Sequence, residues 1–277
     1  MFTINLEYPV RAVPRYGQGK PSHARIREII DSRRAVYAQT VSQLKQHAPA
    51  LSAFPLQRNP LAIDQPYWQN DFLSGLDVAV LYHFLVTGNP GHYIEIGSGN
   101  STMVAKRAIR DSGLRTRITS IDPSPRAEIN ALCDEVIRQP FEELGDLRAF
   151  SSLSEGDIVF LDGSHRVFMN SDVTAFFLDV LPNLPKGILV HIHDIFLPDD
   201  YPAAWVDRYY SEQYLVACYL LPNGPSSFEI VMPNYFVSKD PQLSSAIRSF
   251  WSKVGIDGIN PFGCSFWLRT RETTPPA

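Results

Sequence analysis

The sequence has little of what marks secreted, membrane-bound and nucleic-acid-binding proteins. Only three of its 277 residues are cysteines, and the wide spacing of Cys133, Cys218 and Cys264 in apolar surroundings predicts reduced core residues rather than disulfides or metal ligands. No stretch approaches the roughly 18 consecutive apolar residues of a membrane-spanning helix. Residues 1–11 also lack the basic start and apolar core of a signal peptide. We therefore expect a cytoplasmic protein without a membrane partner.

An excess of positive charge is missing as well. The chain has 25 Lys and Arg against 29 Asp and Glu, which gives a formal net charge of -4, and it contains no run of basic residues. A nucleic acid is attracted by a positive surface, which this composition does not supply. We expect a small-molecule acceptor as the partner and no nucleic acid, and the composition leaves an oligomer open.

The hydrophobic content, at 44% of the residues, is sufficient for one sizeable core. Periodic apolar residues predict helices over residues 22–47 and 71–85, after an irregular arm that is rich in Pro and Gly. We expect a single domain over residues 1–277, in which residues 1–90 form the arm and a helical cap and residues 91–277 form an α/β core.

From Tyr93 onward, short apolar runs alternate with helical stretches, a pattern typical of parallel strands covered by helices on both faces. The predicted strands are 92–96, 117–121, 135–139, 157–161 and 187–191. A helix over 204–221, a strand over 227–237, a helix over 241–254 and a strand over 264–269 should follow. The predicted fold is therefore a Rossmann-like open sheet, mainly parallel, with an antiparallel last strand.

A glycine-rich loop, Glu-Ile-Gly-Ser-Gly-Asn-Ser-Thr at residues 95–102, connects the first predicted strand to a helix. Gly97 and Gly99 allow a tight turn and close approach of a ligand to the backbone, and the helix start supplies unpaired N–H groups. The same loop could also be a structural turn that binds nothing.

Asp122 strengthens the ligand-binding interpretation, because it ends the second predicted strand where an adenosine ribose needs a hydroxyl acceptor. A dinucleotide site usually has a third glycine, whereas this loop continues with Asn100, Ser101 and Thr102. Together with the negative charge of Glu95, the pattern favours a cationic cofactor without phosphates.

These motifs resemble the class I methyltransferases, in particular the branch with the metal-dependent macrolide-sugar O-methyltransferases and cephalosporin hydroxylase-like proteins. The resemblance covers about residues 68–197 and is carried by the sequences at 93–101, 121–123 and 161–165. It implies S-adenosylmethionine as cofactor, with the methionine part near the glycine loop, the ribose at Asp122 and the adenine near Glu142. The cofactor-binding residues that it implies are Glu95, Gly97, Ser98, Gly99, Asn100, Ser101, Asp122, Glu142 and Asp162.

A second group of polar residues follows two later strands. Asp162 and His165 come directly after the fourth strand, and His193 and Asp194 follow the fifth. Because parallel strands end at the same edge, the two pairs should meet in one crevice. Carboxylates and imidazole with open positions suit Mg, Mn or Fe, and the resemblance implies Asp162, His193 and Asp194 as the metal ligands.

The resemblance supports this metal site and gives the histidine matching His165 the role of general base. His193 departs from the family pattern, because a carboxylate is usual there. Imidazole titrates near neutral pH and could accept a hydroxyl proton. The alternative is structural: Asp162 caps a turn, His165 contacts the cofactor, and His193 is a hydrogen-bonded core residue.

The leading hypothesis is methyl transfer from S-adenosylmethionine to a hydroxyl oxygen of a small polar acceptor, with possible assistance from a divalent metal. A metal-dependent oxygenase or hydroxylase on the same sheet is a second hypothesis, in which His165, His193 and an acid hold iron. The third is a non-catalytic protein that keeps only the cofactor site. Bound iron with oxygen-dependent turnover would favour the second, and a filled acceptor crevice the third.

Overall fold

The computed structural model describes residues 7–8, 10–62, 64–125, 128–222 and 227–271. Seven strands form one sheet in the order β3-β2-β1-β4-β5-β7-β6. The strands are β1 (His92–Ile96), β2 (Arg117–Ile121), β3 (Glu135–Ile137), β4 (Ile158–Leu161), β5 (Leu189–Ile192), β6 (Phe228–Pro233) and β7 (Phe266–Thr270). The first five run parallel, and β7 is antiparallel to both β5 and β6. The predicted Rossmann-like fold, with its antiparallel last strand, is confirmed.

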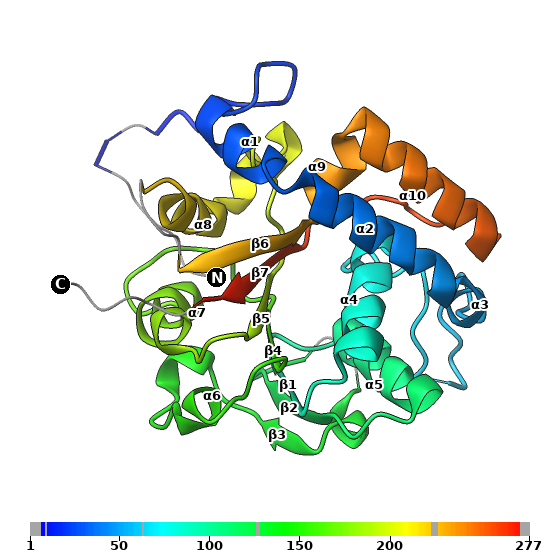
Figure 1. The fold of residues 1–277 in the computed structure, drawn as a ribbon. Helices are drawn as coiled ribbons and strands as arrows, with labels where there is room; N and C mark the ends of the chain where they lie inside the picture. The colour runs from blue at the N-terminus through cyan, green and yellow to red at the C-terminus, as the bar shows by residue number, and fades with distance from the viewer. Residues whose placement is uncertain (1–6, 9, 63, 126–127, 223–226, 272–277) are drawn as a thin grey trace.

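Helices cover both faces of this sheet, as expected for parallel strands that are buried on both sides (Figure 1). On one side lie α2 (Arg34–Leu44), α4 (Gly75–Gly88) and α5 (Asn100–Ser112). On the other lie α6 (Arg148–Ser151), α7 (Asp172–Ala175) and α8 (Glu212–Leu220). The remaining helices are α1 (Ala24–Asp31), α3 (Ala48–Leu51), α9 (Asn234–Lys239) and α10 (Pro241–Val254). Within the described residues, no helix is both long and apolar enough to cross a membrane.

Short helical turns connect these elements. Five are 3₁₀ turns: η1 (Lys45–His47), η2 (Asn130–Leu132), η3 (Phe141–Glu143), η5 (Leu181–Asn183) and η6 (Ala203–Arg208). A π-helical turn, η4 (Phe176–Val180), continues α7. One hydrophobic cluster joins Tyr37 of α2, Leu81 of α4 and Phe160 of β4, so the N-terminal helices share their core with the sheet. The division into cap and core stays a prediction.

The N-terminal helices differ from their predicted bounds. The helix predicted over 22–47 breaks between α1 and α2, where Ser32 turns its hydroxyl back to the Ile29 carbonyl and Arg33 leaves the helical conformation. The Arg33 side chain instead donates to the Ile230 carbonyl of β6. The helix predicted from residue 71 starts at Gly75, because the Asn70 side chain accepts from the backbone N–H groups of the two residues after Asp71.

The C-terminal half departs from prediction in two places. The helix predicted over 204–221 is divided into η6 and α8 at Tyr209, whose φ of 53° lies in the left-handed region. The strand predicted over 227–237 ends at Pro233, and α9 follows, because the Asn234 side chain donates to Asp77 instead of continuing along the sheet. The strand expected from residue 264 begins at Phe266, whereas α10 has its predicted bounds.

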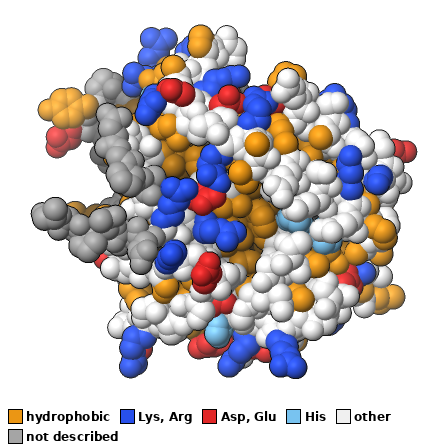
Figure 2. Space-filling view, viewed as in Figure 1, with side chains coloured by type: hydrophobic (Ala, Val, Ile, Leu, Met, Phe, Trp, Pro, Cys, Tyr) orange, Lys and Arg blue, Asp and Glu red, His pale blue; other side chains and the backbone are white. Residues whose placement is uncertain are grey.

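The predicted environment of the cysteines is also only partly correct. Cys264 is buried, Cys133 is half-buried and Cys218 is exposed. On the face shown in Figure 2, basic and acidic side chains are interspersed rather than separated. Over β6, for example, Glu229 pairs with both Arg33 and Arg271. Among the described residues of this face, basic side chains thus lie beside acidic ones.

Candidate active site at the carboxyl edge

The glycine loop after β1 is held against the neighbouring strands. The backbone N–H of Gly97 donates to the Ile121 carbonyl of β2 at 3.0 Å, and the Asp162 N–H donates to Ile96 at 2.8 Å. A Cβ on Gly97 would lie 1.9 Å from the Asp162 carbonyl oxygen, and its φ is 80°. Glycine is therefore required at this position by the backbone next to it.

Gly99 differs, because a Cβ added there would meet no atom within 4 Å. It directly precedes α5, so the space in front of it adjoins the N-terminal N–H groups of that helix. A small cleft is formed here by Phe72, Leu73, Ser98, Gly99, Asn100, Ser101 and Asp162. The open space beside Gly99 can therefore accommodate part of a ligand.

Asp122 connects the two ends of the site. Its Oδ2 accepts from the backbone N–H of Ser98 at 2.8 Å, and its Oδ1 accepts from that of Ser124 at 2.7 Å. A cavity of about 390 Å³ opens beside it. The lining residues are Ile96, Gly97, Ser98, Ile121, Asp122, Pro123, Ser124, Pro140, Phe141, Glu142, Asp162, Gly163, Ser164, Ser171 and Asp172.

Eight of the nine predicted cofactor-binding residues line this cavity or the adjoining cleft, and Ser98 and Asp162 line both. Glu95 is the exception. Its carboxylate is buried below the loop, where it accepts from the Tyr93 hydroxyl at 2.9 Å and from the Thr102 hydroxyl. Burial raises the pKa of Glu95 to about 7, although the neighbouring hydroxyls oppose this shift. Glu95 therefore supports the loop from below.

His165 lies at the centre of a buried group of acids. Its Nδ1 lies 2.9 Å from Glu212 Oε2, and its Nε2 lies 3.2 Å from Asp162 Oδ1 and 3.5 Å from Asp194 Oδ2. Burial alone would lower the pKa of His165, but the hydrogen bonds to Asp162 and Glu212 and the charges of Glu212 and Asp194 raise it well above its usual range. This arrangement therefore favours the protonated ring.

The pKa values of Asp162 and Glu212, the two acids closest to His165, are shifted in opposite directions. Burial opposes ionisation of Asp162, but His193 and His165 hold the pKa of Asp162 below its ordinary value. Burial raises the pKa of Glu212, and the hydrogen bond from His165 only partly offsets this. Glu212 Oε1 has no hydrogen-bond partner within the described residues. Asp162 therefore loses its proton more readily than Glu212 does.

Glu212 was not recognised from the sequence as a site residue. It begins α8, 47 residues after His165, and the only local signal was an acid next to an apolar, aromatic run. The backbone carbonyl of His165 accepts from the N–H groups of Ser211 and Glu212, so α8 begins directly against the histidine. The Tyr210 ring also packs on the imidazole, with centroids 4.6 Å apart.

His191 and His193 have different environments, although His191 lies in β5 and His193 directly follows it. His191 is buried, stacks on Phe160 with centroids 3.7 Å apart, and its Nε2 lies 2.7 Å from the Ser265 hydroxyl. Burial and the charge of His193 hold the pKa of His191 well below its usual range, so it is a neutral core residue.

His193 contacts acids through both ring nitrogens. Its Nδ1 lies 3.4 Å from Asp194 Oδ1 and 3.6 Å from Asp162 Oδ1, whereas its Nε2 lies 3.7 Å from Asp77 Oδ2. Burial opposes protonation of His193, but the charges of Cys264, Asp162 and Asp194 raise its pKa well above its usual range. In the described part of the chain, the metal-ligating atoms that converge within 4.8 Å belong to Asp77, His193 and Cys264. The predicted set of Asp162, His193 and Asp194 stays a prediction.

Comparison with known proteins agrees with this site. Residues 94–195 match the family model of a methyltransferase domain. The resemblance to class I methyltransferases is confirmed. This methyltransferase-like segment begins in β1 and ends after β5, so it includes the glycine loop, Asp122, His165 and His193. The helices before it, together with β6 and β7, lie outside the match.

Several solved methyltransferase structures are similar over most of the chain. A Podospora anserina methyltransferase bound to SAH has 15% identity and a TM-score of 0.44, covering 88% of this chain and 97% of its own. A putative methyltransferase from Thermobifida fusca has 15% identity and a TM-score of 0.38, covering 73% of this chain and 85% of its own. A Bacillus cereus O-methyltransferase in complex with SAH has 14% identity and a TM-score of 0.35, covering 84% of this chain and 91% of its own. None of the curated protein sequences compared with the chain matches it.

Proposed function

We propose that this protein transfers a methyl group from S-adenosylmethionine to a hydroxyl oxygen of a small polar acceptor. The observation that carries the proposal is the charge of the cavity beside Asp122. Its described lining includes Asp122, Glu142, Asp162 and Asp172 but no Lys or Arg. Phosphate groups would be repelled by such a lining, whereas a sulfonium and an ammonium group would be attracted.

Different residues of the cavity and the adjoining cleft fit different parts of the cofactor. Asp122 offers a carboxylate at the end of β2 for the ribose hydroxyls, and Glu142 lines the same cavity farther along. Gly97, Ser98, Gly99, Asn100 and Ser101 would surround the amino-acid part, with Gly99 leaving open space and Glu95 supporting the loop. When bound, S-adenosylmethionine supplies an electrophilic methyl group on a positively charged sulfur.

His165 would remove the proton from the acceptor hydroxyl. The methyl–sulfur bond of the donor would break as the methyl–oxygen bond forms, and His165 Nε2, which faces Asp162 and Asp194, would take the hydroxyl proton. Glu212 holds the opposite nitrogen and so fixes the orientation of the ring. Because a base must first be unprotonated, the rate of transfer should increase with pH through the raised pKa of His165.

The divalent metal predicted at Asp162, His193 and Asp194 is not needed for this scheme. His165 Nε2 already lies between the carboxylates of Asp162 and Asp194, and in its protonated form it supplies positive charge to both. A metal between these carboxylates would have to displace the ring from one of them. The function proposed here therefore uses positioning and proton transfer by the side chains alone.

Binding of S-adenosylmethionine tests the proposal most directly. Isothermal titration of the full chain should show one site, and Asp122→Ala should weaken binding about ten- to hundredfold, as expected for loss of a charged hydrogen-bond acceptor. Asp146→Ala, at an exposed acid paired with Arg148, is the matched control and should bind normally. ATP and NAD should not compete.

Absence of S-adenosylmethionine binding to the wild-type chain would refute the proposal. The acceptor class is tested separately, by incubating the chain with labelled cofactor and a panel of sugars, phenols and amines. Label on hydroxylated acceptors is the expected result. Label confined to amines would contradict oxygen as the target.

A further inference from the structure

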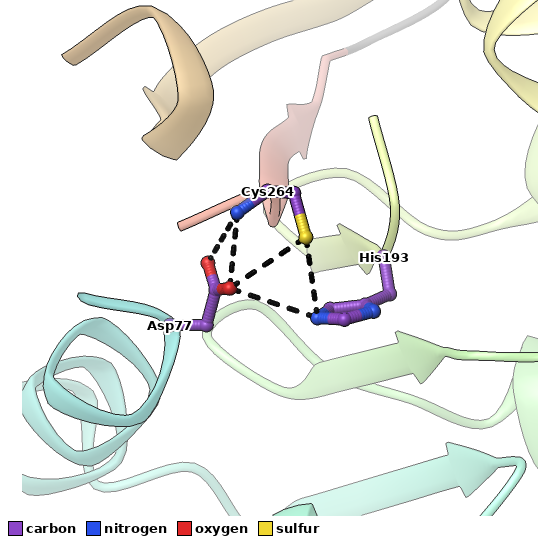
Figure 3. Close-up of side chains that lie close together, drawn as sticks. All are labelled: Asp77, His193 and Cys264. Carbon is purple, nitrogen blue, oxygen red and sulfur yellow. Dashed lines mark hydrogen bonds and ion pairs between the residues drawn. The ribbon is translucent and has the colours of Figure 1, made fainter. Parts of the chain in front are cut away.

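Three metal-ligating side chains from distant parts of the chain meet behind His193. Asp77 comes from α4, His193 follows β5, and Cys264 precedes β7 (Figure 3). All three are buried, and none lines the cofactor cavity or the adjoining cleft. The cluster is therefore separate from the surface on which the cofactor would bind.

The three ligand atoms form a nearly equilateral triangle. Asp77 Oδ2 lies 3.7 Å from His193 Nε2, and Cys264 Sγ lies 3.8 Å from each of them. The centre of such a triangle lies about 2.2 Å from every corner, which is close to the 2.0–2.3 Å of zinc bonds to oxygen, nitrogen and sulfur. Direct hydrogen bonds would bring the nitrogen and oxygen closer, to about 2.7–3.2 Å. The spacing fits a central ion better than direct contacts.

Asp77 is held in the orientation that a ligand requires. Its Oδ1 accepts from the Asn234 side chain at 2.7 Å and from the Ser265 N–H at 2.8 Å, and its Oδ2 accepts from the Cys264 N–H at 3.0 Å. These donors fix the carboxylate while leaving Oδ2 directed toward His193 and Cys264, as Figure 3 shows. Metal-ligating carboxylates are commonly fixed by such outer hydrogen bonds.

From this geometry we infer that Asp77, His193 and Cys264 bind a structural Zn²⁺ ion. A thiolate, an imidazole and a carboxylate are donors that zinc accepts together, whereas Mg²⁺ requires oxygen ligands. On binding, the Cys264 thiol and His193 Nε2 each release a proton to solvent, and the two negative ligands, the Cys264 thiolate and the Asp77 carboxylate, balance the charge of the ion.

The ion would also determine the role of the other nitrogen of His193. With Nε2 on zinc, Nδ1 carries the proton and faces Asp194 at 3.4 Å and Asp162 at 3.6 Å. A zinc-bound histidine typically donates its second N–H to a carboxylate in this way. The ion would therefore stabilise the two acids that face His165, and His193 would not be a ligand of a catalytic metal.

The test compares zinc binding by the full chain and by cysteine variants. The wild-type chain should retain one equivalent of Zn²⁺ after dialysis, and Cys264→Ser should weaken zinc binding by more than about 100-fold, since even outer-shell changes cost 10–100-fold. Cys218→Ser, at an exposed cysteine, is the matched control and should bind as the wild type does. Asp162→Asn should also retain the ion.

Cobalt provides a readout that does not depend on the stability of the Cys264 variant. In a chain carrying both Cys133→Ser and Cys218→Ser, Cys264 is the only thiol, and bound Co²⁺ should show thiolate-to-metal charge-transfer absorption. Zinc should also increase the melting temperature of this chain, because a ligand that binds only the folded state stabilises it. No stoichiometric zinc, cobalt binding without that absorption, or zinc that is lost in Asp162→Asn but retained in Cys264→Ser would overturn the inference.

Discussion

The two halves of the carboxyl edge differ in how their polar groups are satisfied. Around β1 and β2, Asp122 binds backbone N–H groups of its own loops and faces an open cavity. Around β4 and β5, His165 and His193 are buried among carboxylates, of which Glu212 and Asp77 come from the helices α8 and α4. The first half is ready to receive a ligand, whereas the second already contains its counter-charges.

This difference separates binding from chemistry. A cavity made by backbone turns keeps its shape whatever the protonation state of His165, so cofactor binding there should not follow the titration of that ring. The His165 group, in contrast, must lose a proton before it can act as a base. Substitutions in the two halves should therefore change different measurements, and the following predictions test that separation.

The largest effect should come from Gly97→Ala. The added Cβ would lie 1.9 Å from the Asp162 carbonyl at a φ of 80°, so the junction of the two halves must move. We expect the free energy of unfolding to decrease by more than about 4 kcal/mol, measured by urea denaturation.

Gly99 is the matched position for that experiment. Gly99→Ala adds the same methyl group in open space and should change stability by less than about 1 kcal/mol. Gly99→Val should abolish S-adenosylmethionine binding without unfolding the chain. Equal stability of the two alanine variants would show that the backbone contact at Gly97 does not constrain the loop.

The next largest effect should come from His165→Ala. The methyl-transfer rate should decrease about 10²- to 10⁴-fold, the range for loss of a general base, while cofactor affinity stays nearly unchanged. Rates with labelled cofactor and affinities from titration measure the two quantities, and His92→Ala, at a half-exposed histidine on β1, is the control. A collapse of cofactor affinity would make His165 a binding residue instead.

Glu212→Gln should have a smaller effect that is visible in the pH profile. Removing this negative charge lowers the pKa of His165, so the rising part of the rate–pH curve should move to lower pH. The maximal rate should decrease about ten- to hundredfold, because the ring is held less firmly. An unshifted profile with a reduced rate would indicate a purely structural role for Glu212.

The smallest effect should come from Glu95→Gln, on stability rather than rate. The pKa of Glu95 is 4.5 when exposed and about 7 in the folded protein, so the folded state holds its proton more tightly. Wild-type stability should therefore decrease as pH increases from 4.5 to 7, by at most about 3 kcal/mol, and the variant should not show this decrease.

Unfolding measurements at pH 4 and pH 8 check this prediction. The stability of Glu95→Gln relative to the wild type should increase by about 1–3 kcal/mol between the two pH values. Glu142→Gln, at a half-buried carboxylate in the cavity lining, is the control. The same relative change in both variants would exclude burial of Glu95 as the cause.

The parts of the fold that could be predicted from sequence are those determined by local patterns. The runs that form β1 and β2 have their predicted bounds, as does α10 after its Asp240 cap. The breaks at Arg33 and Tyr209 were missed, because they depend on tertiary contacts or on a backbone conformation without a strong sequence signal. The periodic apolar pattern continues across both breaks, so it predicted one uninterrupted helix at each place.

The candidate site divides in the same way. The glycine loop and Asp122 are close in sequence, and a known motif relates them. Glu212, Asp77 and Cys264 could not be assigned, because they reach the histidines only after the sheet and α8 have assembled. The contact between Asp77 and Cys264 spans 187 residues, beyond any local pattern.

The position of β7 has a consequence for the order of assembly. It is the last strand in sequence, yet it lies between β5 and β6 and pairs with both. During synthesis, β5 therefore leaves the ribosome with one unpaired edge, and β6 cannot join the sheet until the C-terminal segment has been made. Contacts between residues so far apart form late because loop closure must precede them. Cys264 lies two residues before this strand and is buried. The time at which its thiol becomes inaccessible to a thiol-modifying reagent during refolding should therefore report when β7 joins the sheet.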